Sequence, residues 1–377
     1  SRGLGDVYKR QDIHLDSPFR SGNAGKSEVR RRELRGTFSS LMMYIKDNGV
    51  ALALLAGDLF DSESVTKNTA DFFFGEMASV PGCRFVISPG NHDPYTPGSV
   101  YAVSDIPENV YIFSDTALNR FRFPEIGVDV YGYAFTKSTL DVCPFVGREP
   151  ADSDMINILC AHADVGNPLS PYCPVSESDI AGTGFDYCAL GHVHNSAGMK
   201  RVGNTYYAYS GCLEGRDFGE TGHKGAIVLD IEKSRGIASV KAAGVRFSKR
   251  RYEICRADVS GCRTDDELMT KLRAAIVGKY GSDTLLRLIL TGNVPPSLRI
   301  STDGIAARFG DGLFYFEVLD RTLPLYDSDA LRSDPTIRGA FFRELLPLLE
   351  NGSPEERADA ARALRLGLMA LNGEREE

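Results

Sequence analysis

Short apolar runs alternate with amphipathic stretches from Asp12 to about Ile231, and this alternation limits the fold more than any other feature. The clearest runs lie at residues 50–56, 84–88, 155–161 and 185–190, with a further one at 225–231. They are rich in Val, Ile and Leu, which indicates strands buried on both faces. Residues 28–47 instead carry apolar side chains at helical spacing, and Gly49 follows as a terminator. The sequence therefore predicts an α/β fold.

Four polar clusters follow apolar runs and a fifth opens the domain at Asp12, and five of the six histidines fall in these clusters. The clusters are Asp12-Ile13-His14, Gly57-Asp58-Leu59-Phe60-Asp61, Gly90-Asn91-His92-Asp93, the single His162, and Gly191-His192-Val193-His194. In an open α/β sheet, the loops beyond the carboxyl ends of the strands converge on one crevice, so residues far apart in sequence can meet there. Taken singly, such dipeptides often mark turns, and a His-x-His is often a surface pair. Their order and their places at strand ends favour one shared site.

The residue types in these clusters point to metal chemistry. Carboxylate, amide and imidazole groups without thiolate suit Mn, Fe or Zn, and a shared Asp can bridge two ions. Phosphodiester hydrolysis needs a nucleophile at neutral pH and neutralisation of charge on the phosphoryl oxygens, and a pair of ions meets both needs. The pattern therefore indicates a metal-dependent phosphoesterase.

A second domain is expected to begin near Tyr252. The basic and small residues at 233–251 read as a connection between domains. Beyond it, strands at 252–259, 284–290 and 313–319 and a helix at 265–280 suggest a small α+β unit, followed by unusually apolar helices at 335–350 and 354–372. We therefore assign one domain to residues 12–250, a second to 251–322 and a helical segment to 323–377.

The first eleven residues, SRGLGDVYKRQ, have neither an initiator Met nor the apolar pattern of a strand. We interpret residues 1–11 as a non-native tail and expect no strand there.

The composition limits the partners and the compartment. A net charge of −8 excludes a protein coated in basic surface, so contact with nucleic acid would have to use local patches or bound metal. Eight cysteines without a CxxC pair indicate buried thiols in a reducing compartment, and we expect a cytoplasmic protein. No apolar run approaches the roughly 20 residues that span a bilayer, so no membrane contact is expected.

The ordered pattern D-x-H, GD, GNH, H and GHxH resembles that of the calcineurin-like metallophosphoesterases, from Asp12 to about Ile231. The resemblance implies a four-layer α/β/β/α sandwich and two divalent ions, Mn first, with Fe, Zn or Mg as alternatives. The ligands that it implies are, for one ion, Asp12, His14, Asp58 and His194, and for the other, Asp58, Asn91, His162 and His192. Asp58 would then bridge the ions. His92 would protonate the leaving oxygen, and Asp61 would orient His92.

Three further stretches narrow the resemblance to the YhaO group, which is similar to SbcD-type DNA-repair exonucleases. They are HLDSPF at 14–19, YSG at 209–211 with GRDFGE at 215–220, and LILTG at 288–292. The resemblance implies DNA as the substrate and a capping domain at about 251–322. It also implies a coiled-coil SMC-like ATPase partner, of the SbcC or YhaN type, docked on the terminal helices. It leaves open a homodimer.

Several alternatives remain open at this point. A small-molecule phosphodiesterase or phosphatase would use the same ligands, and a non-catalytic scaffold for an ATPase would need only the docking helices. Residues 30–32 and 249–251 either contact DNA phosphates or form a solvated charged face. Asp93 either supports the site from behind the ligands or caps a helix.

Overall fold

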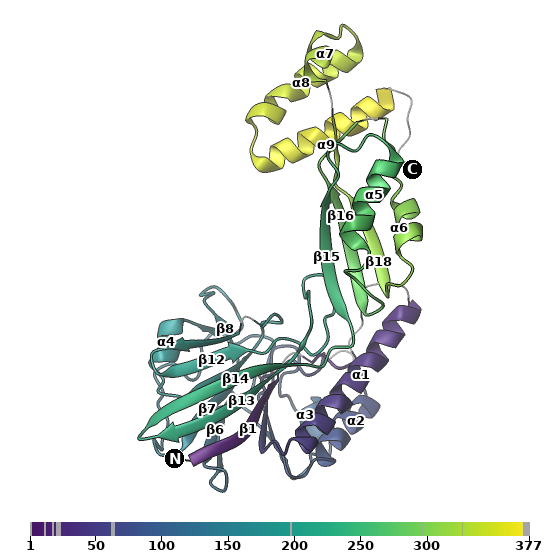
Figure 1. The fold of residues 1–377 in the computed structure, drawn as a ribbon. Coiled ribbons are helices and arrows are strands. Elements are labelled where there is room, and N and C mark those ends of the chain that lie inside the picture. Colours follow the sequence, from purple (N-terminus) through teal and green to yellow (C-terminus); the bar gives the residue numbers. More distant parts are fainter. Residues whose placement is uncertain are drawn as a thin grey trace. The chain divides into compact units, whose positions relative to one another are not determined.

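A computed structural model of the chain describes residues 2–10, 13–16, 19, 24–61, 65–196, 198–295, 297–325 and 327–371. The chain divides into two compact units, Ser1–Tyr252 and Glu253–Glu377. Figure 1 shows the ribbon with its helices and strands labelled.

The first unit contains two six-stranded sheets, and the first of these joins strands from both ends of the unit. Its order is β14 (Ile237–Arg246), β13 (Gly225–Ser234), β1 (Arg2–Arg10), β2 (Leu52–Leu55), β3 (Arg84–Ile87) and β4 (Val110–Ile112). The strands β1 to β4 run parallel, whereas β13 pairs with β1 and β14 in antiparallel fashion. The purple β1 beside the green β13 is visible in Figure 1.

This sheet corrects two predictions. Residues 1–11 were expected to form no strand, yet Arg2–Arg10 pairs with β13 on one side and β2 on the other. Backbone hydrogen bonding on both sides holds a strand whose composition alone gives no strand pattern. Residues 233–251 were expected to connect domains, yet they contain β14, which pairs with β13 along ten residues.

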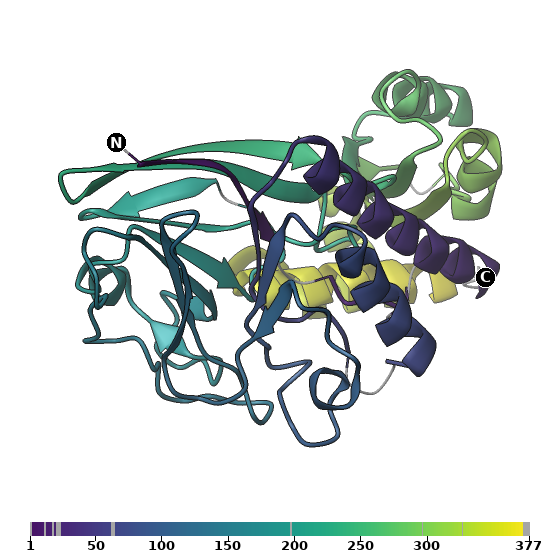
Figure 2. The same ribbon diagram turned by 90° about the horizontal axis from the view of Figure 1, so that it is seen from below.

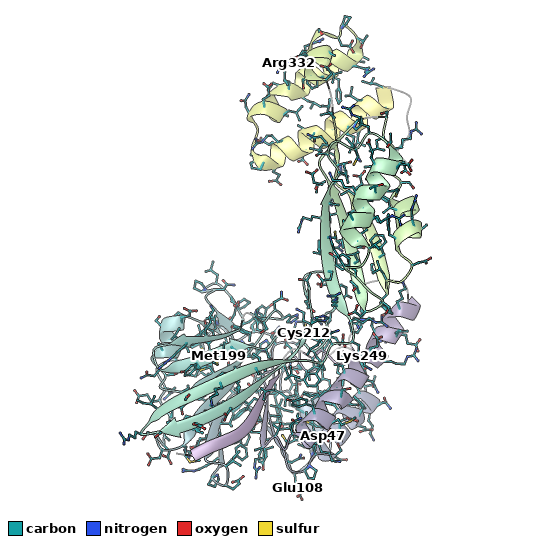
Figure 3. The ribbon with its side chains drawn as sticks, viewed as in Figure 1. Asp47, Glu108, Met199, Cys212, Lys249 and Arg332 are labelled. Atoms are coloured by element: carbon teal, nitrogen blue, oxygen red, sulfur yellow. The ribbon has the colours of Figure 1, made fainter. Side chains whose placement is uncertain are left out.

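The second sheet has the order β11 (Met199–Val202), β12 (Thr205–Tyr209), β10 (Tyr187–Gly191), β7 (Ile156–His162), β6 (Val128–Gly132) and β5 (Asn119–Phe123). Its four central strands are parallel and its edge strands are antiparallel. Figure 3 labels Met199 at the start of β11. A short pair, β8 (Asp164–Val165) and β9 (Pro174–Val175), and the short helix α4 (Glu177–Ala181) follow β7 and precede β10.

The two sheets share one core because β2 and β3 alternate their side chains between two environments. Leu52, Leu54 and Val86 pack with Ile158 and other residues of the second sheet. Ala53, Leu55, Phe85 and Ile87 pack instead with the helices α1 (Ala24–Asp47) and α2 (Lys67–Ala78). These helices lie on the same side of the first sheet in Figures 1 and 2. Burial on both faces explains the continuous apolar runs, and the predicted α/β class is confirmed.

Several predicted elements of the first unit are confirmed with small shifts of their ends. The predicted helix at 28–47 is α1, and Gly49 follows it with a left-handed φ of 63°. The short helix α3 (Val100–Val103) follows β3. All eight cysteines are free and buried, as expected.

The second unit has a three-stranded sheet in the order β15 (Arg251–Asp258), β16 (Thr284–Thr291) and β18 (Tyr315–Asp320). Helices α5 (Asp265–Ile276) and α6 (Thr302–Phe309) share its apolar core. A small pair, β17 (Asn293–Val294) and β19 (Leu323–Pro324), accompanies the sheet.

Three helices end the described chain: α7 (Ser328–Ser333), α8 (Ile337–Asn351) and α9 (Pro354–Leu371). Figure 3 labels Arg332 in α7. Phe342 of α8 packs with Leu364 and Leu368 of α9, so part of the apolar character of these helices is used in packing them on each other. Among the described residues, no helix combines the length and the apolarity needed to cross a membrane.

A buried ion pair fastens α1 to the loop that follows β12. Arg30 and Glu214 are both fully buried, with Nη2 of Arg30 3.1 Å from Oε2 of Glu214. Glu214 also accepts hydrogen bonds from the Thr37 hydroxyl and the backbone N–H of Lys249. Arg30 is therefore buried and can contact neither solvent nor a DNA phosphate. Both sequence-based interpretations, a solvated charged face and a DNA contact, are wrong for this residue.

Replacing Arg30 with Ala should lower the free energy of unfolding by about 3–5 kcal/mol, because Glu214 is left as a buried charge without its partner. Urea denaturation of the purified chain measures this change. The neighbouring exposed Arg31→Ala is the matched control and should change stability by less than about 0.5 kcal/mol. Equal losses in the two variants would contradict the assigned role of Arg30.

Candidate metal centre

The predicted site residues in the described part of the chain follow the carboxyl ends of parallel strands. His14 follows β1, Asp58 and Asp61 follow β2, and Asn91 and His92 follow β3. On the second sheet, His162 ends β7, whereas His192 and His194 follow β10. Asp12, the remaining predicted ligand, lies outside the described residues. The two sheets thus deliver their polar loops to one place, as parallel strands in α/β proteins do.

Three glycines allow these loops to approach each other. A Cβ on Gly191 would lie 1.7 Å from the carbonyl oxygen of Ala56, and one on Gly90 would lie 2.4 Å from Oδ1 of Asp58. A Cβ on Gly57, which has φ +89°, would lie 2.7 Å from Nδ1 of His162. Any side chain at these positions would push the loops apart. The glycine in each of the GD, GNH and GHxH motifs is therefore a packing requirement of the site.

The backbone is also strained at three of the predicted ligands. His14, Asp58 and His192 have φ values of 46°, 53° and 105°, a region that favours glycine. Non-glycine residues are held in such conformations only where the surroundings enforce them, and such residues cluster at functional sites.

His14, Asp58 and His194 form one compact group, in which one ligand atom from each lies within 4.8 Å of the others. Nε2 of His14 lies 4.0 Å from Oδ2 of Asp58 and is buried with no hydrogen-bond partner among the described residues. Burial lowers the pKa of His14, which favours the neutral ring. A buried, unpartnered ring nitrogen beside a carboxylate is the donor arrangement that a divalent cation fits.

His162, on the second sheet, also has a ring nitrogen whose surroundings fit a bound cation. Its Nδ1 lies 2.9 Å from the carbonyl oxygen of Ala56, and its Nε2 lies 2.8 Å from Oδ1 of Asn91 and 3.4 Å from Oδ2 of Asp58. Burial lowers the pKa of His162, so the ring is neutral and carries one proton for these acceptors. With that proton on Nδ1 and directed at Ala56, the Nε2 lone pair faces two oxygens. A cation among these three atoms satisfies all of them.

His192 completes this second side of the site. Its ring centroid lies 5.3 Å from that of His162 and 5.0 Å from that of Tyr172. Asp58 stands between the two sets of side chains, with its Oδ2 facing both His14 and His162. The structure thus gathers seven of the eight predicted ligand contributions, counting Asp58 for both ions, around one carboxylate.

The predicted pair of His92 and Asp61 is also brought together. Nδ1 of His92 lies 3.1 Å from Oδ1 of Asp61, and the same oxygen lies 2.8 Å from Nδ1 of His14. The hydrogen bond with Asp61 raises the pKa of His92. The His92 side chain is 52% exposed, in contrast to the fully buried His14. It is therefore placed to meet a molecule arriving from solvent.

Asp93 supports the site from behind. Its carboxylate accepts hydrogen bonds from the backbone N–H groups of Asp58, Leu59 and Gly90, at 3.1, 2.7 and 2.7 Å, and from the Tyr101 hydroxyl at 2.5 Å. Burial, with a contribution from nearby Asp58, raises the pKa of Asp93 to about 7. Asp93 ties the turn after β2 to the turn after β3 and caps no helix, so the first of the two sequence-based readings agrees with these contacts.

Three side chains at the site carried no predicted role. Glu220 accepts a hydrogen bond from Nδ1 of His194 at 2.6 Å. Burial raises the pKa of Glu220, but the hydrogen bond and charge of His194, together with the backbone N–H and charge of Arg216, outweigh it and lower the pKa to about 2. Cys212, labelled in Figure 3, donates to the other carboxylate oxygen at 3.3 Å. Nη1 of Arg216 lies 3.9 Å from Oδ2 of Asp61. Arg216 and Glu220 lie in the GRDFGE stretch at 215–220, but spacing alone could not show that this loop reaches the site.

Glu220→Gln should weaken Mn²⁺ binding about 10- to 100-fold, because the carboxylate that orients a metal-binding imidazole contributes to affinity on this scale. Calorimetric titration of metal-free protein with Mn²⁺ gives the dissociation constant. Glu232→Gln, an exposed change on β13, serves as the matched control. Unaltered affinity in Glu220→Gln would show that the bond to His194 has no part in metal binding.

Residues 12–196 match the family model for calcineurin-like phosphoesterase. The chain is 27% identical over 318 residues to the uncharacterized metallophosphoesterase YhaO of Bacillus subtilis, across 80% of this chain and 75% of that protein. It is 24% identical over 302 residues to the DNA double-strand break repair protein Mre11 of Methanopyrus kandleri, across 72% and 64% of the two chains. For the protein of the same name from Saccharolobus solfataricus, identity is 26% over 260 residues, across 63% and 65%.

The matched segment contains the described site from His14 to His194, whereas Arg216 and Glu220 lie beyond it. The chain spans less than two thirds of the length of the two Mre11 proteins. Three observations indicate the same metal centre. They are the places of the site residues after strand ends, the buried Nε2 of His14 with no hydrogen-bond partner among the described residues, and the family match. We conclude that this chain contains a calcineurin-like phosphoesterase domain, which hydrolyses phosphoesters at a divalent metal centre.

Proposed function

We propose that this protein is a two-metal phosphodiester hydrolase that cleaves DNA in the cytoplasm. The observation that carries the two-metal part is the position of Asp58. Its Oδ2 lies 4.0 Å from Nε2 of His14 and 3.4 Å from Nε2 of His162, so one carboxylate faces a ring nitrogen from each sheet. A carboxylate with donors on two sides is suited to bridge two ions.

In this proposal one ion is held by Asp12, His14, Asp58 and His194, and the other by Asp58, Asn91, His162 and His192. The donors are carboxylate, amide and imidazole without thiolate, and Mn²⁺ is the ion that we propose. When bound, the ion pair activates water at neutral pH and neutralises charge on the phosphoryl group. The chain's own part is to hold the ligands in place through the bonds of Asp61, Glu220 and Ala56 to the three histidine Nδ1 atoms.

We assign proton transfer to His92. Asp61 occupies Nδ1 of His92 and raises its pKa, so a larger fraction of the ring is protonated near neutral pH. A half-exposed, protonated imidazole beside a phosphoester site is placed to donate a proton to the leaving oxygen. Because Asp61 also contacts His14, one carboxylate orients both the proton donor and a metal ligand.

DNA as the substrate is supported by two lines of comparison. Two of the similar proteins are named for DNA double-strand break repair, at 24% and 26% identity. The segments at 14–19, 209–211, 215–220 and 288–292 resemble the YhaO and SbcD-type exonucleases. The net charge of −8 gives no general attraction to DNA, so recognition of the phosphate is assigned to the site itself.

His92→Ala should lower kcat on DNA about 10²- to 10⁴-fold, the usual contribution of a general acid, while Mn²⁺ affinity stays unchanged because His92 is no ligand. The assay uses single- and double-stranded DNA and bis(4-nitrophenyl) phosphate, each with Mn²⁺. His223→Ala, an exposed histidine outside the clusters, is the control and should retain full activity.

The outcomes of this assay separate the rival functions. Cleavage of the generic diester without any action on DNA would refute the nuclease proposal and favour a small-molecule phosphodiesterase. Absence of cleavage of both substrates by Mn²⁺-loaded protein would refute hydrolysis and favour a scaffold role.

We also propose that the terminal helices dock a coiled-coil SMC-like ATPase. Packing of α8 on α9 uses Phe342, Leu364 and Leu368, but Ile337 and Leu348 of α8 remain 69% and 43% exposed. Exposed apolar side chains on an amphipathic helix are suited to a partner helix or groove.

Ile337→Glu combined with Leu348→Glu should weaken association with such an ATPase at least about tenfold, measured by calorimetry or sedimentation, because it places charges in an apolar contact. Val277→Glu, at an apolar position after α5 that is 59% exposed, is the control. Unchanged association of the double variant, with α8 and α9 still folded by circular dichroism, would refute this docking surface.

A further inference from the structure

The loop between β12 and β13 brings an arginine to the edge of the metal centre. Nη1 of Arg216 lies 3.9 Å from Oδ2 of Asp61, and its Nε lies 3.8 Å from Oε1 of Glu220. Asp61 is the carboxylate bound to His14 and His92, whereas Glu220 is the one bound to His194. The guanidinium of Arg216 therefore lies beside the two carboxylates that bond to His14 and His194, the histidines of the compact ligand group.

The backbone of Arg216 is held firmly in this position. Its N–H donates to Oε2 of Glu220 at 2.8 Å, and its carbonyl accepts from the Tyr252 hydroxyl at 2.8 Å. At Gly215, an added Cβ would lie 2.9 Å from the carbonyl oxygen of Glu220 and 3.0 Å from the Tyr252 ring. Next to it, Glu214 is fixed by the buried pair with Arg30. Contacts on several sides of the backbone thus fix the position from which the Arg216 side chain extends.

The guanidinium makes fewer hydrogen bonds with the described residues than the Arg216 backbone does. At 3.9 and 3.8 Å, the two carboxylates attract its charge but lie beyond hydrogen-bond distance. Its Nε is buried with no hydrogen-bond partner among the described residues, while the side chain as a whole is 24% exposed. The Arg216 guanidinium is partly exposed and lies beside the half-exposed His92. Its N–H groups are therefore placed to bind an anion.

We propose that Arg216 binds the non-bridging oxygens of the phosphodiester and so positions the phosphate beside His92. The planar fork of an arginine matches two phosphate oxygens at once, whereas a lysine offers a single point charge. This inference rests on the proposed function and adds a substrate-binding residue from outside the matched family segment. It also gives an acidic protein a local means of binding a polyanion.

The experiment compares wild type with Arg216→Gln and Arg216→Lys. Steady-state kinetics on bis(4-nitrophenyl) phosphate with Mn²⁺ give KM and kcat, and inorganic phosphate is used as a competitive inhibitor. We expect Arg216→Gln to raise both KM and the inhibition constant of phosphate about 10- to 100-fold, the scale of a lost charge-assisted bidentate contact. Arg216→Lys should fall between the two because it keeps the charge and loses the fork.

Two further measurements separate substrate binding from a structural role. Mn²⁺ affinity by calorimetry and the thermal unfolding midpoint should be the same in Arg216→Gln and wild type. Arg201→Gln, an exposed arginine on β11, is the matched control and should leave all constants unchanged. Weakened Mn²⁺ binding or a lowered midpoint in Arg216→Gln, with no separate effect on phosphate, would overturn the inference, as would unchanged KM and inhibition constants.

Failure of the proposed function is distinguishable from failure of this inference. If wild type does not cleave the diester, hydrolysis is refuted, and Arg216 is judged by calorimetric binding of inorganic phosphate to the Mn²⁺-loaded protein. A loss of phosphate affinity in Arg216→Gln would then support the binding role alone. Equal affinities in wild type and variant would overturn it.

Discussion

The turn at residues 56–58 is the contact on which the rest of the site depends. The Ala56 carbonyl oxygen faces Nδ1 of His162 at 2.9 Å and lies against Gly191, where no Cβ fits. The Asp58 backbone N–H donates to Asp93, and the Asp58 side chain accepts from the His92 backbone N–H. One short turn therefore contacts loops from both sheets. A displacement of this turn would move the ligands of both proposed ions at once.

Carboxylates that hold other side chains are as important to this site as those that face the ligand positions. Asp61 and Glu220 bond to Nδ1 of His14 and His194 and leave Nε2 as the ring atom directed elsewhere. Such bonds fix the tautomer and orientation of an imidazole. They also concentrate negative charge, which Arg216 partly offsets from 3.8 to 3.9 Å.

Local pattern predicted most of the central strands because burial on both faces leaves a continuous apolar run, as in β2, β3, β7 and β10. It failed where pairing partners decide the structure. The strand β1 has a poor strand composition and is held between β13 and β2, and β14 is an edge strand whose exposed, small side chains resemble a linker. Hydrogen bonds to a distant neighbour leave no local signal in either segment.

The sequence by itself determined the residue types of the site and their order along the chain, and this was enough to predict the α/β class and a phosphoesterase chemistry. Those features depend on apolar periodicity and on ligand chemistry, and both are local. Only the tertiary structure decided that Asp93 lies behind the ligands, that Glu220 meets His194 and that Arg216 stands beside Asp61. These contacts join residues up to 155 positions apart, counted from Asp61 to Arg216. Their distances are set by how two sheets pack and by where glycine lets backbones approach.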